Sequence, residues 1–273
     1  MALPRELPMH QLPTENWSGG MNMAIDAAMA ESVTRRGVGY VRVYGWDPST
    51  LSLGYSQNST TIDWEYCASN DIEVTRRPTG GGAIYHDAVG DIAYSVVVPR
   101  DTVPSDLTKS YQLLCEPVIR VFDEVGLDVN FTNTDRNALH QPACYLRGLS
   151  PAHDLVVGDP NARKISGNAQ YRTKEAVVQH GSILYSLDVE AHLGCLATAT
   201  IDSTAFRERV TAIDEHVSVA RSTVVSQLES ILGDYFATEP ETFTDEDRIR
   251  AESLCETRFG NSAWIQRGPR QEG

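Results

Sequence analysis

Three consecutive glycines, Gly80–Gly82, are the feature that most constrains the fold of this chain. The pair Arg76–Arg77 precedes them, the pair His86–Asp87 follows, and the apolar run 92–98 then predicts a strand. Without side chains, the backbone there can lie directly against a ligand, and backbone N–H groups beside guanidinium groups suit a phosphate or a carboxylate. Because charged residues flank the glycines on both sides, the sequence predicts a ligand-binding loop rather than a simple hairpin turn.

The composition limits the class of protein. With 41% hydrophobic residues among 273, the chain is expected to form one large globular domain, or one domain with a small appendage. The formal net charge is −14, which argues against nucleic-acid binding because neutralising phosphates requires a basic surface. No run reaches the roughly 18 apolar residues of a membrane helix, and residues 1–5 lack a signal-peptide core. We therefore expect a cytoplasmic protein that binds neither nucleic acid nor membrane.

The chain has five cysteines: Cys67, Cys115, Cys144, Cys195 and Cys255. Their number is odd and no two form a CxxC pair, so neither a disulfide framework nor a structural zinc site is expected. Most of them fit small core positions. The sequence identifies no set of metal ligands.

The hydrophobic pattern predicts both helices and strands. The predicted helices span 21–33, 105–125 and 219–235, and a last one begins near 244. The predicted strands include 38–44, 51–53, 92–98, 127–131, 154–157, 164–166 and 177–187, with 158–161 joining two of them in a hairpin. Because helices and strands do not alternate regularly, the sequence predicts an α+β fold with a mostly antiparallel sheet.

A second stretch with chemical potential runs from Arg163 to Gln170. Lys164 stands on a predicted short strand, and the small residues Ser166, Gly167 and Ala169 follow it. A fixed ammonium group can stabilise a developing oxyanion or bind a phosphate. Together with the arginine- and glycine-rich loop, this hairpin predicts an anion-binding cleft.

These stretches resemble the lipoate–protein ligase and octanoyltransferase family, relatives of the biotin–protein ligase catalytic domain. The matching blocks are Arg76 to Asp87, Lys164 to Gln170 and Gln179 to Leu184, supported by Asn22 to Asp26 and Arg42 to Trp46. The resemblance implies a biotin/lipoate-ligase-like catalytic domain over residues 1–236, with a mixed, mostly antiparallel sheet flanked by helices. Residues 237–273 would form a C-terminal helix and tail packed on it.

The resemblance also implies an activity and a set of site residues. Family members attach lipoyl or octanoyl groups to a lysine of the lipoyl domain of a 2-oxoacid dehydrogenase E2 subunit or of the glycine-cleavage H protein. By position, Lys164 would contact the acyl carbonyl. The residues expected to hold the acyl group and shape its site are Arg76, Gly80, Gly81, Gly82, Tyr85, His86, Asp87, Ser166, Gly167, Ala169, His180 and Gly181.

Two mechanisms compete within this family. A ligase activates lipoate with ATP and Mg²⁺ to form lipoyl-adenylate, whereas a transferase moves octanoyl from acyl carrier protein onto a cysteine, which here would be Cys144. Gly82 and the run 83–87 favour the ligase, while the run from Cys144 to 157 resembles the nucleophile loop of an octanoyltransferase branch.

Ala152–Asp154 departs from the Arg-Asn-Asp triplet of many ligases. Some ligases need an accessory domain for the adenylation half-reaction, which a separate subunit could supply. The sequence narrowly favours the ligase. A non-catalytic lipoate or lipoyl-domain binder and a biotin ligase are further alternatives.

Overall fold

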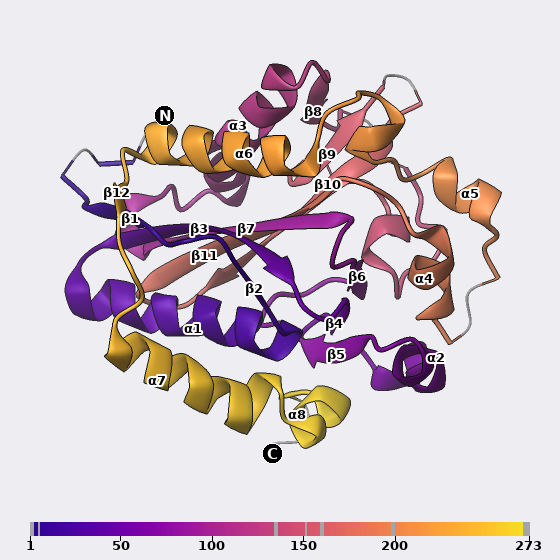
Figure 1. Ribbon diagram of the computed structural model, residues 1–273, viewed down its shortest axis with the longest axis horizontal. Helices are drawn as coiled ribbons and strands as arrows, with labels where there is room; N and C mark the ends of the chain where they lie inside the picture. The colour runs from indigo at the N-terminus through magenta and orange to yellow at the C-terminus, as the bar shows by residue number, and fades with distance from the viewer. Residues whose placement is uncertain are drawn as a thin grey trace.

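The computed structural model describes residues 3–4, 6–133, 136–150, 152–158, 161–197 and 200–269. Two sheets and the helices around them make up this part of the chain (Figure 1). The helices are α1 (Gly19–Arg36), α2 (Trp64–Ser69), α3 (Leu107–Glu124), α4 (Val189–Gly194), α5 (Ser203–Arg207), α6 (Arg221–Phe236), α7 (Asp245–Leu254) and α8 (Ser262–Arg267).

The larger sheet has nine strands, and antiparallel pairing dominates its centre. Its order is β12 (Glu239–Pro240), β1 (Met9–Gln11), β3 (Gly39–Trp46), β7 (Asp91–Pro99), β11 (Ala176–Leu184), β10 (Arg163–Arg172), β9 (Asp154–Val157) and β8 (Val129–Phe131), with β2 (Glu15–Trp17) beside β3. Parallel pairing occurs only at the β12, β1 and β2 contacts of this sheet in the part of the chain described. The prediction of a mixed, mostly antiparallel sheet is therefore confirmed.

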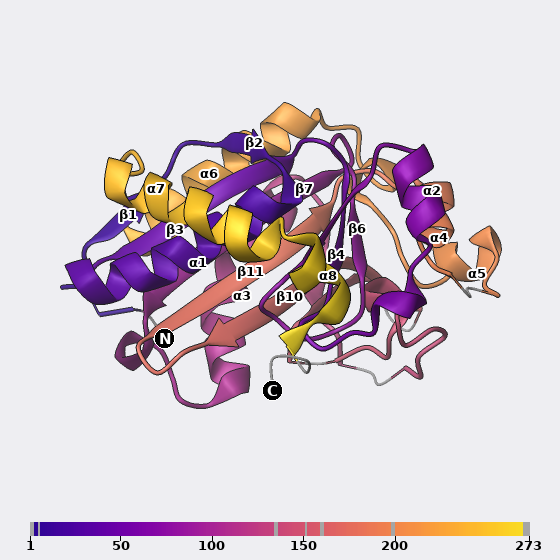
Figure 2. The ribbon, with the colours of Figure 1, turned by 90° about the horizontal axis from the view of Figure 1, so that it is seen from below.

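A smaller sheet carries the glycine-rich segment. Its strands are β5 (Glu73–Arg76), β4 (Thr50–Leu53) and β6 (Ile84–His86), in that order. β4 runs parallel to β5 and antiparallel to β6, so Gly80–Gly82 lie on the connection between the two outer strands. Figure 2 shows this sheet beside one end of the larger one, next to α8.

Helices cover both faces of the larger sheet (Figure 1). On one face α3 and α6 bury an aliphatic core that includes Leu114, Val118 and Leu228. On the other face, α1 and α7 pack together and cover a second core around Met29 and Val97. The helical spacing that the sequence shows at 105–125 and 219–235 predicted α3 and α6 closely.

Two local expectations need comment. The glycines Gly19 and Gly20 belong to α1 instead of preceding it, because Ser18 caps the helix by accepting a hydrogen bond from the Met21 N–H. The hairpin of β9 and β10 is confirmed, although residues 159 and 160 of its connection lie outside the described residues.

Candidate active site

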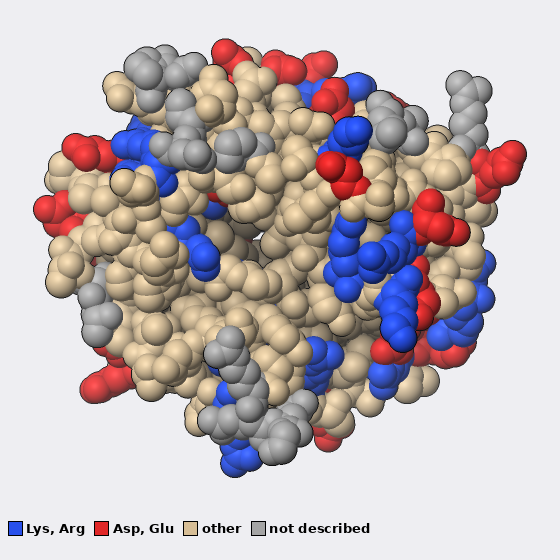
Figure 3. Space-filling model, turned by 180° about the vertical axis from the view of Figure 1, so that it is seen from behind, with Lys and Arg blue, Asp and Glu red and all other residues tan. Residues whose placement is uncertain are grey.

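A cavity of about 300 Å³ opens between the two sheets. This volume lies at the small end of the range for ligand sites. Figure 3 shows that the face opposite to that of Figure 1 is hollowed near its centre, with lysine and arginine side chains on either side of the hollow. The residues that line the cavity are Met23, Tyr44, Trp46, Ser52, Arg77, Gly80, Gly81, Ile84, His86, Tyr111, Cys144, Arg147, Gly148, His153, Asp154, Lys164, Gly167, Asn168, Ala169, Gln170, His180, Gly181 and Ser182.

Lys164 extends from β10 into this cavity and is only 3% exposed. Its Nζ lies 2.6 Å from Asp154 Oδ1 on the neighbouring strand β9, and 3.9 Å from the Sγ of Cys144. Burial acts to lower the pKa of Lys164, but the negative charge of Asp154 beside it outweighs this effect and raises the pKa, and a negative charge on Cys144 acts in the same direction. The ammonium group therefore stays charged next to the thiol.

Asp154 is the partner that keeps this buried charge balanced. Burial alone would raise the pKa of its carboxyl group, but the attraction of Lys164 and the contact with His153 lower it. The carboxylate also accepts a hydrogen bond from the Ser150 N–H at 2.8 Å. A charged pair of this kind is stable inside a protein when further hydrogen bonds satisfy it.

Cys144 is half-buried and begins the short 3₁₀ turn Cys144–Leu146. Its N–H donates to the Ala83 carbonyl at 2.8 Å, and the Ala83 N–H donates to the Pro142 carbonyl at 2.6 Å. A Cβ placed on Gly82 would lie 2.6 Å from that same Pro142 oxygen and 2.8 Å from the Cys144 nitrogen. The third glycine is therefore needed for the close approach that holds the cysteine segment against the glycine loop.

Arg77 folds the glycine loop around its own guanidinium group. Its Nη2 donates to the carbonyls of Gly80 and Gly82 at 2.8 and 2.7 Å, and its Nη1 donates to the Ser52 carbonyl at 2.8 Å. Burial lowers the pKa of Arg77 to about 10. The side chain lines the cavity, but most of its hydrogen bonds hold the backbone of the loop in place.

Arg76 points the other way, and the sequence prediction that it holds the acyl group does not agree with its position. Its Nε and Nη2 donate to the Ile265 carbonyl on α8 at 2.9 and 2.6 Å. Its Nη1 donates to the carbonyls of Gly54, Tyr55 and Gln57. Neighbouring residues of a strand face opposite sides, so only one arginine of the pair can reach the cavity, and that residue is Arg77.

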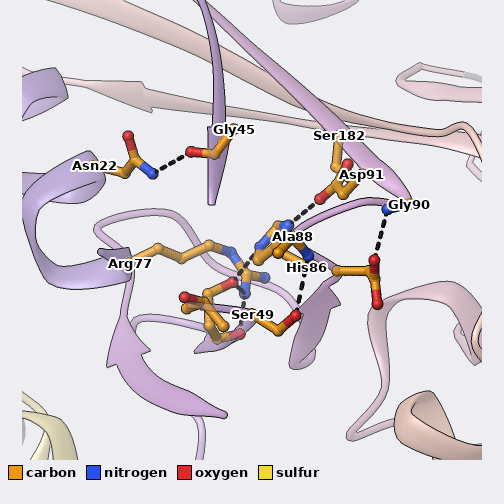
Figure 4. A network of polar contacts seen from close by, with 12 residues as sticks. Asn22, Gly45, Ser49, Arg77, His86, Ala88, Gly90, Asp91 and Ser182 are labelled. Atoms are coloured by element: carbon orange, nitrogen blue, oxygen red, sulfur yellow. Dashed lines mark hydrogen bonds and ion pairs between the residues drawn. The ribbon is translucent and has the colours of Figure 1, made fainter. Parts of the chain in front are cut away.

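His86 belongs to a buried chain of hydrogen bonds. Its Nδ1 lies 2.5 Å from Asp91 Oδ2 (Figure 4). Its Nε2 lies 2.9 Å from the Ser52 hydroxyl, and its ring stacks on Trp46 at 3.9 Å. The Ser182 hydroxyl donates to the other Asp91 oxygen at 2.8 Å. Serine, histidine and aspartate in series are also the pattern of a hydrolase triad. Here the hydroxyl of Ser52 is buried and also accepts a hydrogen bond from Arg77 Nη1 at 3.3 Å, so it is held within the cavity wall, and the chain of hydrogen bonds stiffens that wall.

Small residues of β10 and β11 form the opposite part of the cavity. A Cβ on Gly181 would lie 2.3 Å from both Asn168 Oδ1 and the Tyr94 ring. His180 joins this part to the glycine loop, since its Nε2 lies 2.9 Å from the Thr79 hydroxyl. Together with Met23 and Tyr44, these residues leave a slot with an apolar lining suited to an acyl chain.

Nine of the site residues predicted from the sequence line the cavity together: Gly80, Gly81, His86, Cys144, Lys164, Gly167, Ala169, His180 and Gly181. Five do not line it: Arg76, Gly82, Tyr85, Asp87 and Ser166.

Each of the remaining residues outside the cavity has a structural partner. Tyr85 is buried in a core beneath the small sheet, and its hydroxyl donates to Asp87 at 3.0 Å. Asp87 also accepts from the backbone N–H groups of Val89 and Gly90, which closes the turn before β7. Ser166 accepts a hydrogen bond from the Asn168 side chain.

Three charged residues of the cavity were not among the site residues predicted from the sequence: Arg77, Arg147 and Asp154. The alternation of side chains at the end of β5 could have indicated that Arg77, and not Arg76, faces the cavity. Asp154 was visible as a lone carboxylate at the start of a strand that pairs with the Lys164 strand. Arg147 lies in an irregular segment, where spacing gives no direction for a side chain.

No three or more His, Cys, Asp and Glu side chains gather in the described part of the chain where they could hold a metal ion. No helix there has both the length and the apolar character to cross a membrane.

Proteins of similar sequence belong to one kind of enzyme. Octanoyltransferase LipM of Exiguobacterium sp. is 33% identical over 275 residues, covering 94% of this chain and 97% of that protein. Octanoyltransferase LipM of Kyrpidia tusciae is 34% identical, covering 89% and 93%.

Solved structures share the fold. Lipoate-protein ligase A bound with ATP matches with a TM-score of 0.78 at 24% identity, over 96% of this chain and 98% of that one. A bi-partite lipoate protein ligase of Thermoplasma acidophilum, described with its E2 lipoyl domain, matches with a TM-score of 0.78 at 22% identity, over 98% and 100%.

The model of one family, the lipoyl protein ligase A/B catalytic domain, matches residues 18–237. The family resemblance drawn from the sequence is thereby confirmed. The chain belongs to the lipoyl protein ligase A/B catalytic domain family and is an enzyme of lipoyl or octanoyl transfer.

Proposed function

We propose that this enzyme transfers an octanoyl group from the thioester of an acyl carrier protein to a lysine of a lipoyl domain, through a thioester on Cys144. The observation that carries the proposal is the position of Cys144 Sγ, 3.9 Å from the Lys164 ammonium group at the wall of the cavity. The similar proteins named octanoyltransferase support it. The sequence narrowly favoured a ligase, and these two observations shift the preference to the transferase.

In the first step, the Cys144 thiolate attacks the thioester carbonyl of the donor. The new C–S bond forms to Cys144 Sγ, the carrier's C–S bond breaks, and the carrier leaves as a thiolate that takes a proton from solvent. Lys164 lies beside the sulfur and stays protonated, so it stabilises both the thiolate and the negative charge that develops on the carbonyl oxygen. The acyl tail occupies the slot between Gly181 and Met23.

In the second step, the lysine amine of the lipoyl domain attacks the Cys144 thioester. The amide bond forms, the bond to Sγ breaks, and the amine loses a proton to solvent. Cys144 returns to a thiolate beside the Lys164 ammonium group, which makes it a good leaving group. Among described residues, no further cysteine lines the cavity.

The ligase alternative requires ATP and Mg²⁺, and the cavity meets this requirement only in part. Lys164 and Arg147 could face an adenylate phosphate. However, Asp154 holds Lys164 at 2.6 Å, and Ala152 and His153 stand where many ligases have arginine and asparagine. We therefore derive no step through ATP or Mg²⁺. A non-catalytic binder is disfavoured because the nucleophile and the cation are both in place.

We further propose the acceptor and the organisation of the chain. The acceptor is the lipoyl domain of an E2 subunit or of the glycine-cleavage H protein, and the transferase mechanism needs no accessory subunit. The catalytic unit spans 1–236, with 237–273 as a C-terminal helix and tail packed on it. The bonds from Arg76 to Ile265 and the ion pair of Arg35 with Asp247 at 2.7 Å support that packing.

Intact-mass analysis of a purified lipoyl domain tests the proposal. One reaction contains octanoyl–acyl carrier protein without ATP, and the other contains lipoate, ATP and Mg²⁺. We expect one added octanoyl group in the first reaction only, its loss in Cys144→Ser, and an octanoyl adduct on the enzyme itself when the lipoyl domain is left out. Cys255→Ser is the matched control, because Cys255 is also half-buried but lies outside the cavity. Modification in the ATP reaction alone, unaffected by Cys144→Ser, would establish the ligase instead.

A further inference from the structure

The cation that the mechanism leaves unused is Arg147. Its side chain lines the cavity and is exposed, and it comes three residues after Cys144, at the end of the same 3₁₀ turn. Among described residues, no carboxylate or carbonyl accepts a hydrogen bond from its guanidinium group. Arg76, Arg77 and Lys164 all have such partners.

The surroundings of Arg147 are positively charged. Burial lowers the pKa of Arg77, and the charge of Arg147 lowers it further. Two more arginines have their backbone close to this wall: the Arg136 carbonyl accepts from the Leu149 N–H at 3.2 Å, and the Arg209 carbonyl accepts from the Lys164 N–H at 2.7 Å. The Arg136 guanidinium group donates to the Ala162 carbonyl at 2.8 Å. Burial and the neighbouring Arg136 both lower the pKa of Arg209. In a chain of net charge −14, the three cations that line the cavity, Arg77, Arg147 and Lys164, favour an incoming anion.

The chemistry of the acyl donor identifies that anion. An acyl carrier protein holds its thioester on an arm attached through a phosphodiester, and an acyl-adenylate carries a phosphate directly beside the acyl group. An arginine with an unpaired planar fork binds phosphate oxygens in a bidentate manner. Because the pantetheine chain separates the carrier's phosphate from the thioester sulfur, that phosphate stays towards the solvent side of the cavity, where the exposed Arg147, unlike the buried Lys164, can meet it.

We propose that Arg147 binds the phosphate ester of the acyl donor and thereby selects phosphate-bearing donors. This inference deepens the proposed function and rests on it for the donor's identity. The phosphate contact itself is common to both donor types, so it can be tested without any transfer reaction.

Calorimetric binding tests the proposal with four probes: 4′-phosphopantetheine, pantetheine, adenosine monophosphate and adenosine. The wild type should bind each phosphorylated probe more tightly than its unphosphorylated counterpart. Arg147→Gln should remove that preference, a loss of roughly tenfold or more in affinity, because a charge-assisted hydrogen bond is lost. Arg147→Lys should keep part of it. A larger preference within the pantetheine pair identifies the carrier protein's arm as the source of the phosphate, and a larger preference within the adenosine pair identifies an acyl-adenylate.

The control is Arg248→Gln, which removes an exposed arginine of α7 outside the cavity and should keep the wild-type preference. A phosphate preference that survives Arg147→Gln, or that the wild type lacks, would overturn the inference. The intact-mass experiment on the lipoyl domain tests the proposed function separately, because an absence of octanoyl transfer there does not affect the binding measurements. With octanoyl-phosphopantetheine and octanoyl-pantetheine as donors, Arg147→Gln should lower kcat/KM for the phosphorylated donor only.

Discussion

The two walls of the cavity use their charged groups in opposite ways. In the glycine wall (Ser52, residues 77–82 and His86), hydrogen bonds within the protein hold both the Arg77 fork and the His86 ring. In the hairpin wall (Cys144, Arg147, Asp154 and Lys164), one carboxylate balances two cations, and the sulfur faces an ammonium group. The glycine wall is thus built to keep its shape, and the hairpin wall keeps charge available for the substrate.

The largest effect is expected from Lys164→Met in the hairpin wall. Octanoyl transfer should fall by a factor of about 10² to 10³ or more, since the group that stabilises the thiolate and the oxyanion is lost. The variant also leaves Asp154 buried without its partner, which costs about 3–5 kcal/mol of unfolding free energy. Transfer rates and urea unfolding measure the two effects.

The double variant Lys164→Met with Asp154→Asn separates these effects. It removes the unpaired charge, so most of the stability should return while transfer stays absent. Recovery of transfer together with stability would mean that Lys164 acts only through the fold, and the contrast between the walls would then be wrong.

A somewhat smaller effect is expected where the walls touch, at Gly82. In Gly82→Ala, the new methyl group meets the Pro142 carbonyl and the Cys144 nitrogen, both of them backbone atoms that cannot rotate away. The cysteine segment must shift, and a displacement of about 1 Å costs roughly 10²-fold in rate. The rate of Cys144 alkylation and of thioester formation should both change.

Gly194→Ala is the matched control for Gly82→Ala. Its methyl group would clash with the Tyr66 ring, in a core away from the cavity. We expect it to lower the unfolding free energy but to leave the alkylation rate of Cys144 unchanged. Equal alkylation rates in the two variants would show that Gly82 does not position the cysteine.

The walls also differ in how far the sequence could predict them. The glycine wall was visible because Gly80–Gly82 form a contiguous motif on a strand connection. The direction of Arg76 was not visible, since its acceptor on Ile265 lies 189 residues away on α8. The hairpin wall could be predicted only in part. Lys164 stands on a predicted strand, but Arg147 follows a turn whose sequence has no periodicity. The overall fold was easier, because α3, α6 and the central strands carry strong hydrophobic patterns.

Effects of moderate size are expected at the adjacent arginines, of which Arg77 lines the cavity and Arg76 does not. Arg77→Lys should lower both stability and transfer, because a lysine cannot hold the carbonyls of Gly80, Gly82 and Ser52 at once. Arg76→Lys should cost about 2–3 kcal/mol of unfolding free energy and expose α8 to proteolysis. For the same loss of unfolding free energy, its rate of octanoyl transfer should fall less than that of Arg77→Lys. An equal loss of transfer at equal stability would place Arg76 in the site after all.

The smallest effect is the dependence of stability on pH, and the walls should differ in it as well. Burial, opposed by Asp91, lowers the pKa of His86 from 6.5, so its contribution is complete above pH 6.5 and fades as the pH falls towards the folded value. The pKa of Asp154 is lowered from 3.8, so its contribution is complete above that value and fades only in stronger acid.

Unfolding free energies of matched variants measure this difference. His86→Gln should flatten the slope of stability below about pH 6.5, leaving the parts that come from His140, His192 and His216, whose pKa values burial also lowers, that of His192 to about 3. The Lys164→Met, Asp154→Asn double variant should differ from the wild type in slope only below about pH 4, or above about pH 10.5, where the raised pKa of Lys164 begins to matter. A slope change in the double variant near pH 6 would mean that the hairpin wall titrates together with the glycine wall, and that the two do not act separately.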